Sequence, residues 1–211
     1  MFSSRLLRRE WLSESVFEVE LERPRGFGFT AGQSIRVFVG ESGRDYSLAG
    51  GPSAGTLSLC VRLVEGGAVS PFLAGASLGA SATFTGPHGV FTLAASTRPM
   101  VWAATGVGVA PFLAMVRAGA TGFTLLHGVR RNQVLFFRNE LEASAARYVP
   151  CLSRETGPGC FSGRVTGWAA ANLPPGMYDI SLCGNRRMVR DFMMIVDERF
   201  PGSRVFTEIF F

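Results

Sequence analysis

The stretch Arg44-Asp45-Tyr46-Ser47-Leu48 places a cation, an aromatic ring and a hydroxyl within four residues. It follows an apolar run at residues 35–39, which predicts a short strand that ends in a loop. If the backbone stays extended, Arg44 and Tyr46 point to one side. Tyr46 can then lie against a flat ring and Arg44 can bind phosphate oxygens, while Ser47 hydrogen-bonds ring heteroatoms. A flavin nucleotide has these groups; the alternative is an edge strand with a surface arginine and a half-buried tyrosine.

The composition describes a globular chain. Its 211 residues suffice for one large domain or two small ones, and 47% are hydrophobic against 18% charged. The net charge of +5 favours an acidic partner, while the scattered arginines without a nucleic-acid motif argue against nucleic acid. Four cysteines without metal or cluster spacing, and only two histidines, predict no metal site and reduced thiols, as in the cytoplasm.

Residues 99–116 carry no charge over a length that raises the question of a membrane span. Gly106, Gly108 and Pro111 lie in the middle of this stretch, so a strand, a glycine turn and a helix explain it better. Residues 1–14 include arginines but no apolar core, which argues against a signal peptide. We therefore expect a cytoplasmic protein without a membrane span.

The sequence pattern of residues 1–97 predicts an antiparallel β-barrel. Phe17, Val19 and Leu21 alternate with glutamates, the period of a half-buried strand. Further strands are predicted, with frequent turns between them, at residues 35–39, 57–63, 83–85 and 90–93. One short helix is expected at residues 69–74, after two glycines.

After residue 97 strands and helices alternate, which predicts a parallel sheet covered on both faces. Strands are expected at residues 100–104, 123–127, 147–152, 178–183 and 205–206, and helices at 109–117, 133–146, 167–173 and 187–199. The predicted architecture is thus two domains, 1–97 and 98–211.

Taken together, the motifs of the chain resemble the ferredoxin–NADP(+) reductase family over nearly its whole length. In order, they are Arg44-x-Tyr46-Ser47, Gly66-Gly67-Ala68-Val69-Ser70, Gly86-Pro87-His88-Gly89-Val90-Phe91, Thr105-Gly106-Val107-Gly108-Val109-Ala110-Pro111, Cys183-Gly184 and a C-terminal aromatic residue. The resemblance implies an N-terminal flavin-binding barrel, with Arg44, Tyr46, Ser47 and Leu48 at FAD, followed by a nucleotide-binding α/β domain.

The segment from Gly66 to Ser70 is expected to open the short helix at residues 69–74. Its amides, at Gly66, Gly67 and Val69, and the Ser70 hydroxyl can hold an anion such as the flavin pyrophosphate. A glycine-rich turn with a serine cap is an equally good interpretation of the same residues.

The segment from Thr105 to Pro111 follows a predicted buried strand and opens a helix. Gly106 and Gly108 let a phosphate approach the backbone, and Pro111 suits the first helical turn. The third glycine of the common dinucleotide fingerprint is absent. Gly-x-Gly-x-x-Pro is instead the pattern of the family resembled here, in which it contacts the nicotinamide dinucleotide.

The 2′-phosphate of NADPH is expected beyond the strand at residues 147–152. In related reductases a Ser-Arg pair, here Ser153-Arg154, and a later cation, here Arg164, hold this dianion. Arg130 and Arg131 are alternative contacts. A cofactor without the phosphate would usually meet an acid. We therefore favour NADPH over NADH; a surface salt bridge between Arg154 and Glu155 is the alternative.

The resemblance also implies the groups at the reacting atoms. Cys183 and Gly184 end a strand beside the nicotinamide, where the cysteine packs and is no nucleophile. Glu208 belongs to a proton or hydrogen-bond network, and a terminal aromatic residue, Phe210 or Phe211, covers the flavin; a hydrophobic terminal strand is the alternative. Ser47 completes this catalytic group. We expect both His88, in a turn, and His127, at a strand end, to be structural.

The expected activity is hydride transfer from NADPH to FAD, followed by release of single electrons to a separate, acidic redox protein such as ferredoxin or flavodoxin. Two alternatives stay open. One is a reductase of free flavin, which shares Arg-x-Tyr-Ser. The other is an electron-transfer subunit of a larger complex.

Overall fold

The computed structural model describes residues 1–93 and 95–210, and of Phe210 the backbone only. The chain forms two compact units. We call them the barrel unit, which comprises residues 1–93 and 110–119, and the α/β unit, which comprises the described residues of 94–109 and 120–211. The chain therefore passes between units after residues 93, 109 and 119, whereas the sequence analysis places one boundary at residue 97.

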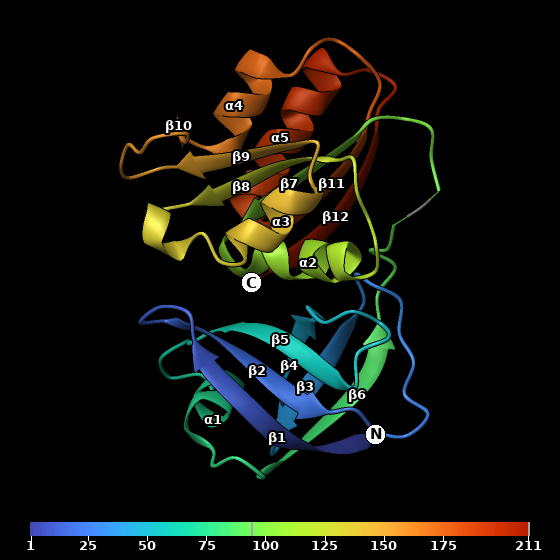
Figure 1. Cartoon of the computed structure of the whole chain (residues 1–211), viewed down its shortest axis with the longest axis vertical. Helices are drawn as coiled ribbons and strands as arrows, with labels where there is room; N and C mark the ends of the chain where they lie inside the picture. Colours follow the sequence, from blue (N-terminus) through green and yellow to red (C-terminus); the bar gives the residue numbers. More distant parts are fainter. Residues whose placement is uncertain (94, 211) are drawn as a thin grey trace. The chain divides into compact units, whose positions relative to one another are not determined.

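The barrel unit contains one antiparallel sheet of six strands in the order β4-β3-β6-β1-β2-β5 (Figure 1). A bridge between Leu48, just after β4, and Leu59 on β5 joins the two edges, so the sheet closes on itself as predicted. The strands and the one helix before β6 are β1 (Phe2–Trp11), β2 (Val16–Glu22), β3 (Ser34–Val39), β4 (Ser42–Ser47), β5 (Thr56–Arg62), α1 (Val69–Gly75) and β6 (Ser81–His88).

The alternating pattern of β2 determines which of its sides faces the barrel core. Phe17, Val19 and Leu21 are completely buried, together with Ile35 and Val37 of β3. Since successive residues of a strand point to opposite sides, the glutamates of β2 lie on the outer side of the sheet. The strand predictions at 35–39 and 57–63 and the helix prediction at 69–74 are confirmed to within one or two residues.

Four predictions for this unit were wrong or incomplete. Arg44 lies in β4, not in a loop, because residues 42–47 form a hairpin with β3. Residues 89–93 form no strand: Gly89 turns at φ +92° and Val90 is 94% exposed. His88 is instead the last residue of β6 and pairs with Ser34. Strand β1 was missed, since arginines interrupt its apolar residues.

The α/β unit contains a parallel sheet in the order β10-β9-β8-β7-β11-β12. From β7 the chain first builds outward through β8, β9 and β10, and then returns to place β11 and β12 on the other side of β7. Its elements, together with helix α2 of the barrel unit, are β7 (Met100–Thr105), η1 (Gly106–Val109), α2 (Ala110–Arg117), β8 (Thr124–Val129), η2 (Asn132–Val134), α3 (Arg138–Ser144), β9 (Arg147–Leu152), β10 (Phe161–Ser162), α4 (Val165–Asn172), β11 (Asp179–Asn185), α5 (Arg186–Arg199) and β12 (Arg204–Phe210).

Helices cover both faces of this sheet, as expected for a parallel one (Figure 1). Helices α4 and α5 pack on one face, where Trp168 and Phe192 join a core built on alternate residues of the strands. Helix α3 lies on the other face. On that face Trp102 of β7 stacks on Phe123 with ring centroids 3.8 Å apart.

The predicted continuous helix at residues 133–146 is broken in two. A 3-10 turn, η2, is followed by Phe137 at φ +58°, and α3 begins only at Arg138. Leu135 and Phe136 are both buried although they are neighbours, and Leu135 packs on Val129 and Leu152. The backbone departs from the helical conformation here, so that Leu135 and Phe136 are both buried.

The uncharged stretch at residues 99–116 forms β7, η1 and α2. Among the described residues, no helix is long and apolar enough to cross a membrane.

His127 of β8 is completely buried in the α/β unit. Its Nδ1 lies 2.9 Å from the Tyr148 hydroxyl, and its Nε2 has no hydrogen-bond partner among the residues that the structure describes. Burial lowers the pKa of His127 from 6.5 to about 4. The side chain is therefore a neutral, structural imidazole at physiological pH.

The buried histidine predicts a loss of stability in mild acid. The unfolded chain binds the proton near pH 6.5 and the folded chain only near pH 4, so the contribution is full above pH 6.5 and falls as the pH drops toward 4. We expect the free energy of unfolding in urea to fall by about 2 kcal/mol from pH 7.5 to pH 5. His127→Asn, which keeps an amide near the Tyr148 hydroxyl, should abolish most of this slope. An unchanged slope would assign the acid sensitivity to other groups.

Candidate functional site

The first candidate site lies on β4. Its register with β3 places Tyr46 opposite Ile35 and Arg44 opposite Val37, so both side chains lie on one side of the hairpin. Tyr46 is half-buried against the barrel core, whereas Arg44 is exposed and donates to the carbonyl of Gly43, at 3.2 Å. Burial raises the pKa of Tyr46 to about 12, against a smaller lowering by the charge of Arg44. The strand thus offers a neutral aromatic ring beside a cation.

Ser47, at the end of β4, is the most informative polar group of the barrel unit. It is 3% exposed, and its hydroxyl has no hydrogen-bond partner among residues 1–93 and 95–210. Leu48 contributes less: its side chain is in the core and its amide donates to the carbonyl of Gln33 at 2.9 Å. A buried hydroxyl without a partner is costly, which indicates that a polar ligand completes it.

The turn before α1 uses its serine internally. The Ser70 hydroxyl accepts a hydrogen bond from the Val64 amide at 3.0 Å, and Gly67 donates to the Val64 carbonyl at 3.1 Å. Gly66 has φ +73°, and Val69 is buried in the core. These contacts are those of a glycine-rich turn closed by a serine; the Ser70 proton remains free for a further acceptor.

The second candidate site lies where the strand order of the α/β unit reverses, between β7 and β11. The turn Gly106–Val109 follows β7, and a β-carbon on Gly108 would lie 2.5 Å from the Cys183 carbonyl oxygen at the end of β11. Gly106 has φ +55° with open space around it. Ligands of open α/β sheets bind at such a switch point, where a backbone without side chains admits a phosphate.

One residue at this switch point was missed from the sequence. The Asn185 amide donates to the Thr105 hydroxyl at 2.9 Å, and its side chain caps α5 by accepting from the amides of Arg187 and Met188. It therefore fixes the β7 turn to the end of β11. An asparagine between a strand and a helix is a recognisable cap signal, which could have identified it.

The loop that carries Ser153 and Arg154 lies beside Arg130. The Ser153 amide and hydroxyl donate to the Val129 carbonyl at 3.0 and 3.2 Å, and the Arg154 amide donates to the Arg130 carbonyl at 3.1 Å. The loops after β8 and β9 are therefore joined by their backbones. A small apolar cluster of Val129, Leu135 and Leu152 lies beneath them.

Four exposed guanidinium groups belong to these loops and to the end of β10, which pairs with β9. Within the described part of the chain none has a side-chain hydrogen bond or ion pair; they are Arg130, Arg131, Arg154 and Arg164. Glu155 does not pair with Arg154, because its carboxylate accepts a hydrogen bond from the Asn132 amide. The expected alternative, a surface salt bridge between them, is thus not what the structure shows.

Cys183 and Glu208 are register partners on β11 and β12. The thiol is completely buried, and burial raises its pKa, with a further contribution from the Glu208 carboxylate. It is therefore protonated at physiological pH and can pack but not attack. The backbone of Phe210 belongs to β12. Its side chain, and all of Phe211, lie outside the described residues, so the stacking prediction for the terminal aromatic residue remains a prediction.

The described residues contain no group of three or more His, Cys, Asp or Glu side chains that could hold a metal ion.

Comparison with known proteins identifies the class. Residues 4–93 match the oxidoreductase FAD-binding domain family and residues 102–193 match the oxidoreductase NAD-binding domain family. The chain is 36% identical to ferredoxin–NADP reductase B of Sorangium cellulosum, over 89% of this chain and 88% of that protein. It therefore belongs to the ferredoxin–NADP(+) reductase family of FAD- and NAD(P)-binding, electron-transferring oxidoreductases.

Two further comparisons describe the range of this family. The ferredoxin–NAD(P)(+) reductase component of the naphthalene 1,2-dioxygenase/salicylate 5-hydroxylase systems of a Ralstonia species is 34% identical over 84% of this chain. This chain spans 58% of that protein. A ferredoxin NADP+ reductase structure from Neisseria gonorrhoeae has the same fold, with a TM-score of 0.84, 24% identity and coverage of 100% of this chain and 98% of that one.

The residues of the barrel unit fit a flavin. The ligand would meet the half-buried ring of Tyr46, the unpaired buried hydroxyl of Ser47 and the exposed cation of Arg44. In the α/β unit, the turn at Gly106–Val109 fits a dinucleotide, since its glycines leave the backbone open at the switch point.

The close approach at Gly108 makes a testable prediction. Gly108→Ala should lower the free energy of unfolding by about 1–3 kcal/mol, because the new methyl group meets backbone that cannot give way. Gly167→Ala is the matched control: it lies on α4 with only ordinary contacts, and should be neutral or add up to about 1 kcal/mol. Equal stabilities for the two variants in urea unfolding would refute the tight packing of the turn.

Proposed function

We propose that this chain transfers a hydride from NADPH to bound FAD and passes the electrons singly to a separate redox protein, such as ferredoxin or flavodoxin. The observation that carries the proposal is the group of exposed guanidiniums just beyond β8, β9 and β10, which have no side-chain partner among the described residues. A dianionic 2′-phosphate is the part of NADPH that NADH lacks, and arginine suits it. The bound flavin supplies the change from two-electron to one-electron chemistry.

The chain's own residues position the reactants in this proposal. Tyr46 packs on the flavin, Arg44 binds its phosphate, and Ser47 supplies the hydrogen bond that the barrel leaves unmade. Gly106 and Gly108 admit the dinucleotide phosphates to the backbone. Cys183 fills space beside the nicotinamide as a neutral thiol, and Glu208 on the neighbouring strand holds a proton or a hydrogen bond.

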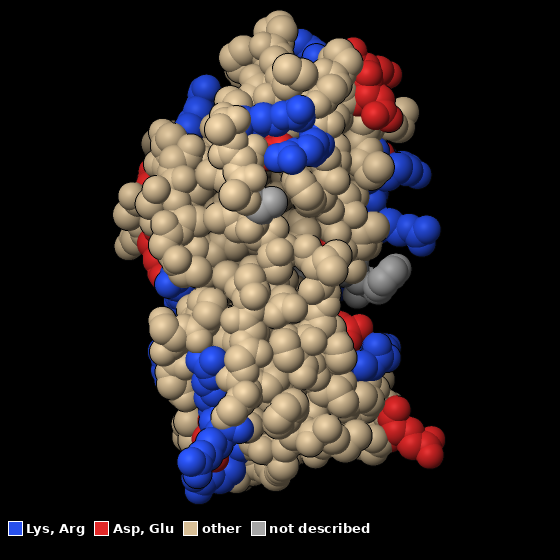
Figure 2. Space-filling view, turned by 90° about the vertical axis from the view of Figure 1, so that its right-hand side faces the viewer, with Lys and Arg blue, Asp and Glu red and all other residues tan. Residues whose placement is uncertain are grey.

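The charge distribution supports an anionic nucleotide in the α/β unit. That unit carries twelve arginines against eight acidic residues, whereas the barrel unit carries nine against eight. The face in Figure 2 shows basic side chains separated by uncharged surface on both units. The positive excess can also steer an acidic acceptor protein toward the molecule.

A second candidate is the reductase component of an oxygenase system. It is favoured by relatives named as electron transfer components, including those of toluate 1,2-dioxygenase and xylene/toluene monooxygenase from Pseudomonas putida. This chain spans 58% and 59% of those two proteins. The two candidates share the site chemistry and differ in the acceptor.

The proposed function is tested with the purified chain. NADPH oxidation with ferricyanide as acceptor, and then reduction of a ferredoxin or flavodoxin, are the expected results. Reduction of free FMN at a higher rate than either protein acceptor would favour a free-flavin reductase. No oxidation of NADPH or NADH with any acceptor would contradict the proposal.

The phosphate specificity is tested at Arg154. Arg154→Ala should weaken NADPH binding by about 1–3 kcal/mol and leave NADH binding nearly unchanged, because only NADPH carries the phosphate. Arg199→Ala, on the last turn of α5, removes the same charge elsewhere in the unit and serves as the control. Equal losses for both nucleotides would remove the 2′-phosphate assignment.

The flavin contact is tested at Tyr46. Tyr46→Ala should weaken flavin binding by about 1–3 kcal/mol through the lost aromatic contact, whereas Tyr46→Phe should retain the flavin. The flavin-to-protein ratio after gel filtration measures both. Full flavin content in the alanine variant would show that the ring does not stack on the cofactor.

A further inference from the structure

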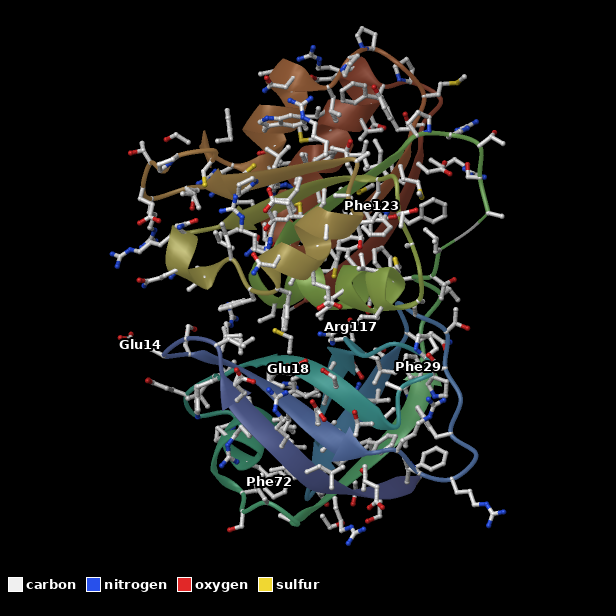
Figure 3. The ribbon with its side chains drawn as sticks, viewed as in Figure 1. Glu14, Glu18, Phe29, Phe72, Arg117 and Phe123 are labelled. Atoms are coloured by element: carbon white, nitrogen blue, oxygen red, sulfur yellow. The ribbon has the colours of Figure 1, made fainter. Side chains whose placement is uncertain are left out.

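A carboxylate on the outer side of the barrel is almost fully enclosed. Glu18 of β2 has a side chain only 10% exposed, and the Ser58 hydroxyl donates to its Oε1 at 2.5 Å. Two guanidiniums approach it: Nη1 of Arg117 lies 3.6 Å from Oε1, and Nη1 of Arg8 lies 3.6 Å from Oε2. Figure 3 shows Glu18 on the barrel and Arg117 at the end of α2, in the same unit.

Arg117 also holds the segment that follows the flavin motif. Its Nη1 donates to the carbonyl of Ala49, two residues beyond Ser47, at 3.1 Å. Ala49 in turn donates to the Ser58 carbonyl at 2.8 Å. The contacts therefore form a closed ring that joins β2, β5, the end of the flavin motif and helix α2.

A glycine permits this close packing. A β-carbon on Gly51 would lie 3.1 Å from the Arg117 carbonyl oxygen and 3.3 Å from its Cβ, so the last turn of α2 rests directly on the backbone of this segment. Two other contacts pack α2 against the strands and loops of the barrel unit. Phe112 lies against Phe91 with ring centroids 5.6 Å apart, and Met115 lies beside Gly32.

Burial of a charged pair is weak evidence for stability, because its desolvation offsets most of the attraction. Such a pair can instead select one arrangement of the segments that carry it, because the two charged groups pair well in only one geometry. Here the segment that the pair holds is α2. Its first residue, Ala110, directly follows Val109, the last residue of the turn Gly106–Val109, which we call the nucleotide turn.

We propose that Glu18 and Arg117 are a positioning pair for hydride transfer. They hold α2, which continues the chain directly from the turn Gly106–Val109, against the segment that follows Ser47. Hydride transfer requires reacting atoms within about 3–3.5 Å, so its rate is sensitive to small displacements of the turn. The inference rests on the proposed function, and neither residue touches the reactants.

The test combines hydrogen exchange with rapid kinetics on the full chain. Glu18→Gln keeps the shape but removes the charge that holds Arg117. Glu22→Gln is the matched control, since Glu22 lies on the same strand and its carboxylate pairs with the exposed Arg5. We expect Glu18→Gln to speed amide exchange in residues 106–117, and to leave exchange in β5 unchanged. The control should match the unmodified chain.

The kinetic result separates positioning from a merely structural role. Flavin reduction at saturating NADPH should slow by about tenfold or more in Glu18→Gln, while the NADPH dissociation constant stays within about twofold. Arg117→Gln should show the same loss, and the double variant no further loss, because the two residues act as a unit.

Unchanged reduction rates with unchanged exchange in α2 would overturn the proposal. If Glu18→Gln does not fold, Arg117→Met, at a position where the side chain is 26% exposed, carries the test with the same readouts. Absence of flavin from the unmodified chain would refute the proposed function instead, and the exchange measurement would still decide whether the pair holds α2.

Discussion

The candidate nucleotide site depends on the close crossing of two backbones where the strand order of the parallel sheet reverses. The turn after β7 lies so near the end of β11 that Gly108 leaves no room for a side chain, and the Asn185 amide fastens the turn through the Thr105 hydroxyl. This crossing presents bare backbone at the carboxyl ends of the strands, just before the N-terminus of α2, whose free amides and dipole favour an anion. The loops that carry Arg130, Arg131 and Arg154 follow β8 and β9, and so belong to the same edge of the sheet, because the carboxyl ends of parallel strands share one edge.

Among the described residues, two buried side-chain polar atoms have no hydrogen-bond partner, and they have different consequences. The Nε2 of His127 lies inside the α/β unit, where burial keeps the ring neutral. The expected consequence is a lower free energy of unfolding in mild acid. The Ser47 hydroxyl lies at the end of a motif whose neighbours are an aromatic ring and a cation. The imidazole is therefore structural, whereas the serine belongs to the candidate flavin site, where a polar ligand would supply the missing partner.

Local patterns were sufficient to predict much of the fold and to single out candidate site residues, whose roles remain predictions. The period-2 alternation in β2 and the glycines after β7 can each be recognised within a short stretch of sequence. They therefore sufficed to predict the two domains and to locate the candidate nucleotide motifs. The break at Phe137 was not, because burial of two adjacent apolar residues overrides a good helical pattern. The contact of Arg117 with Glu18 was not predicted either. The two residues are far apart in the chain and meet through tertiary packing, and nothing in either local sequence indicates the pair.

The most direct measurement is the visible absorption spectrum of the chain purified without added cofactor, before and after anaerobic addition of one equivalent of NADPH. The account predicts a flavin spectrum with about one FAD per chain, bleached by NADPH far faster than by NADH. A colourless protein that takes up no FAD when it is supplied, although correctly folded, would contradict it.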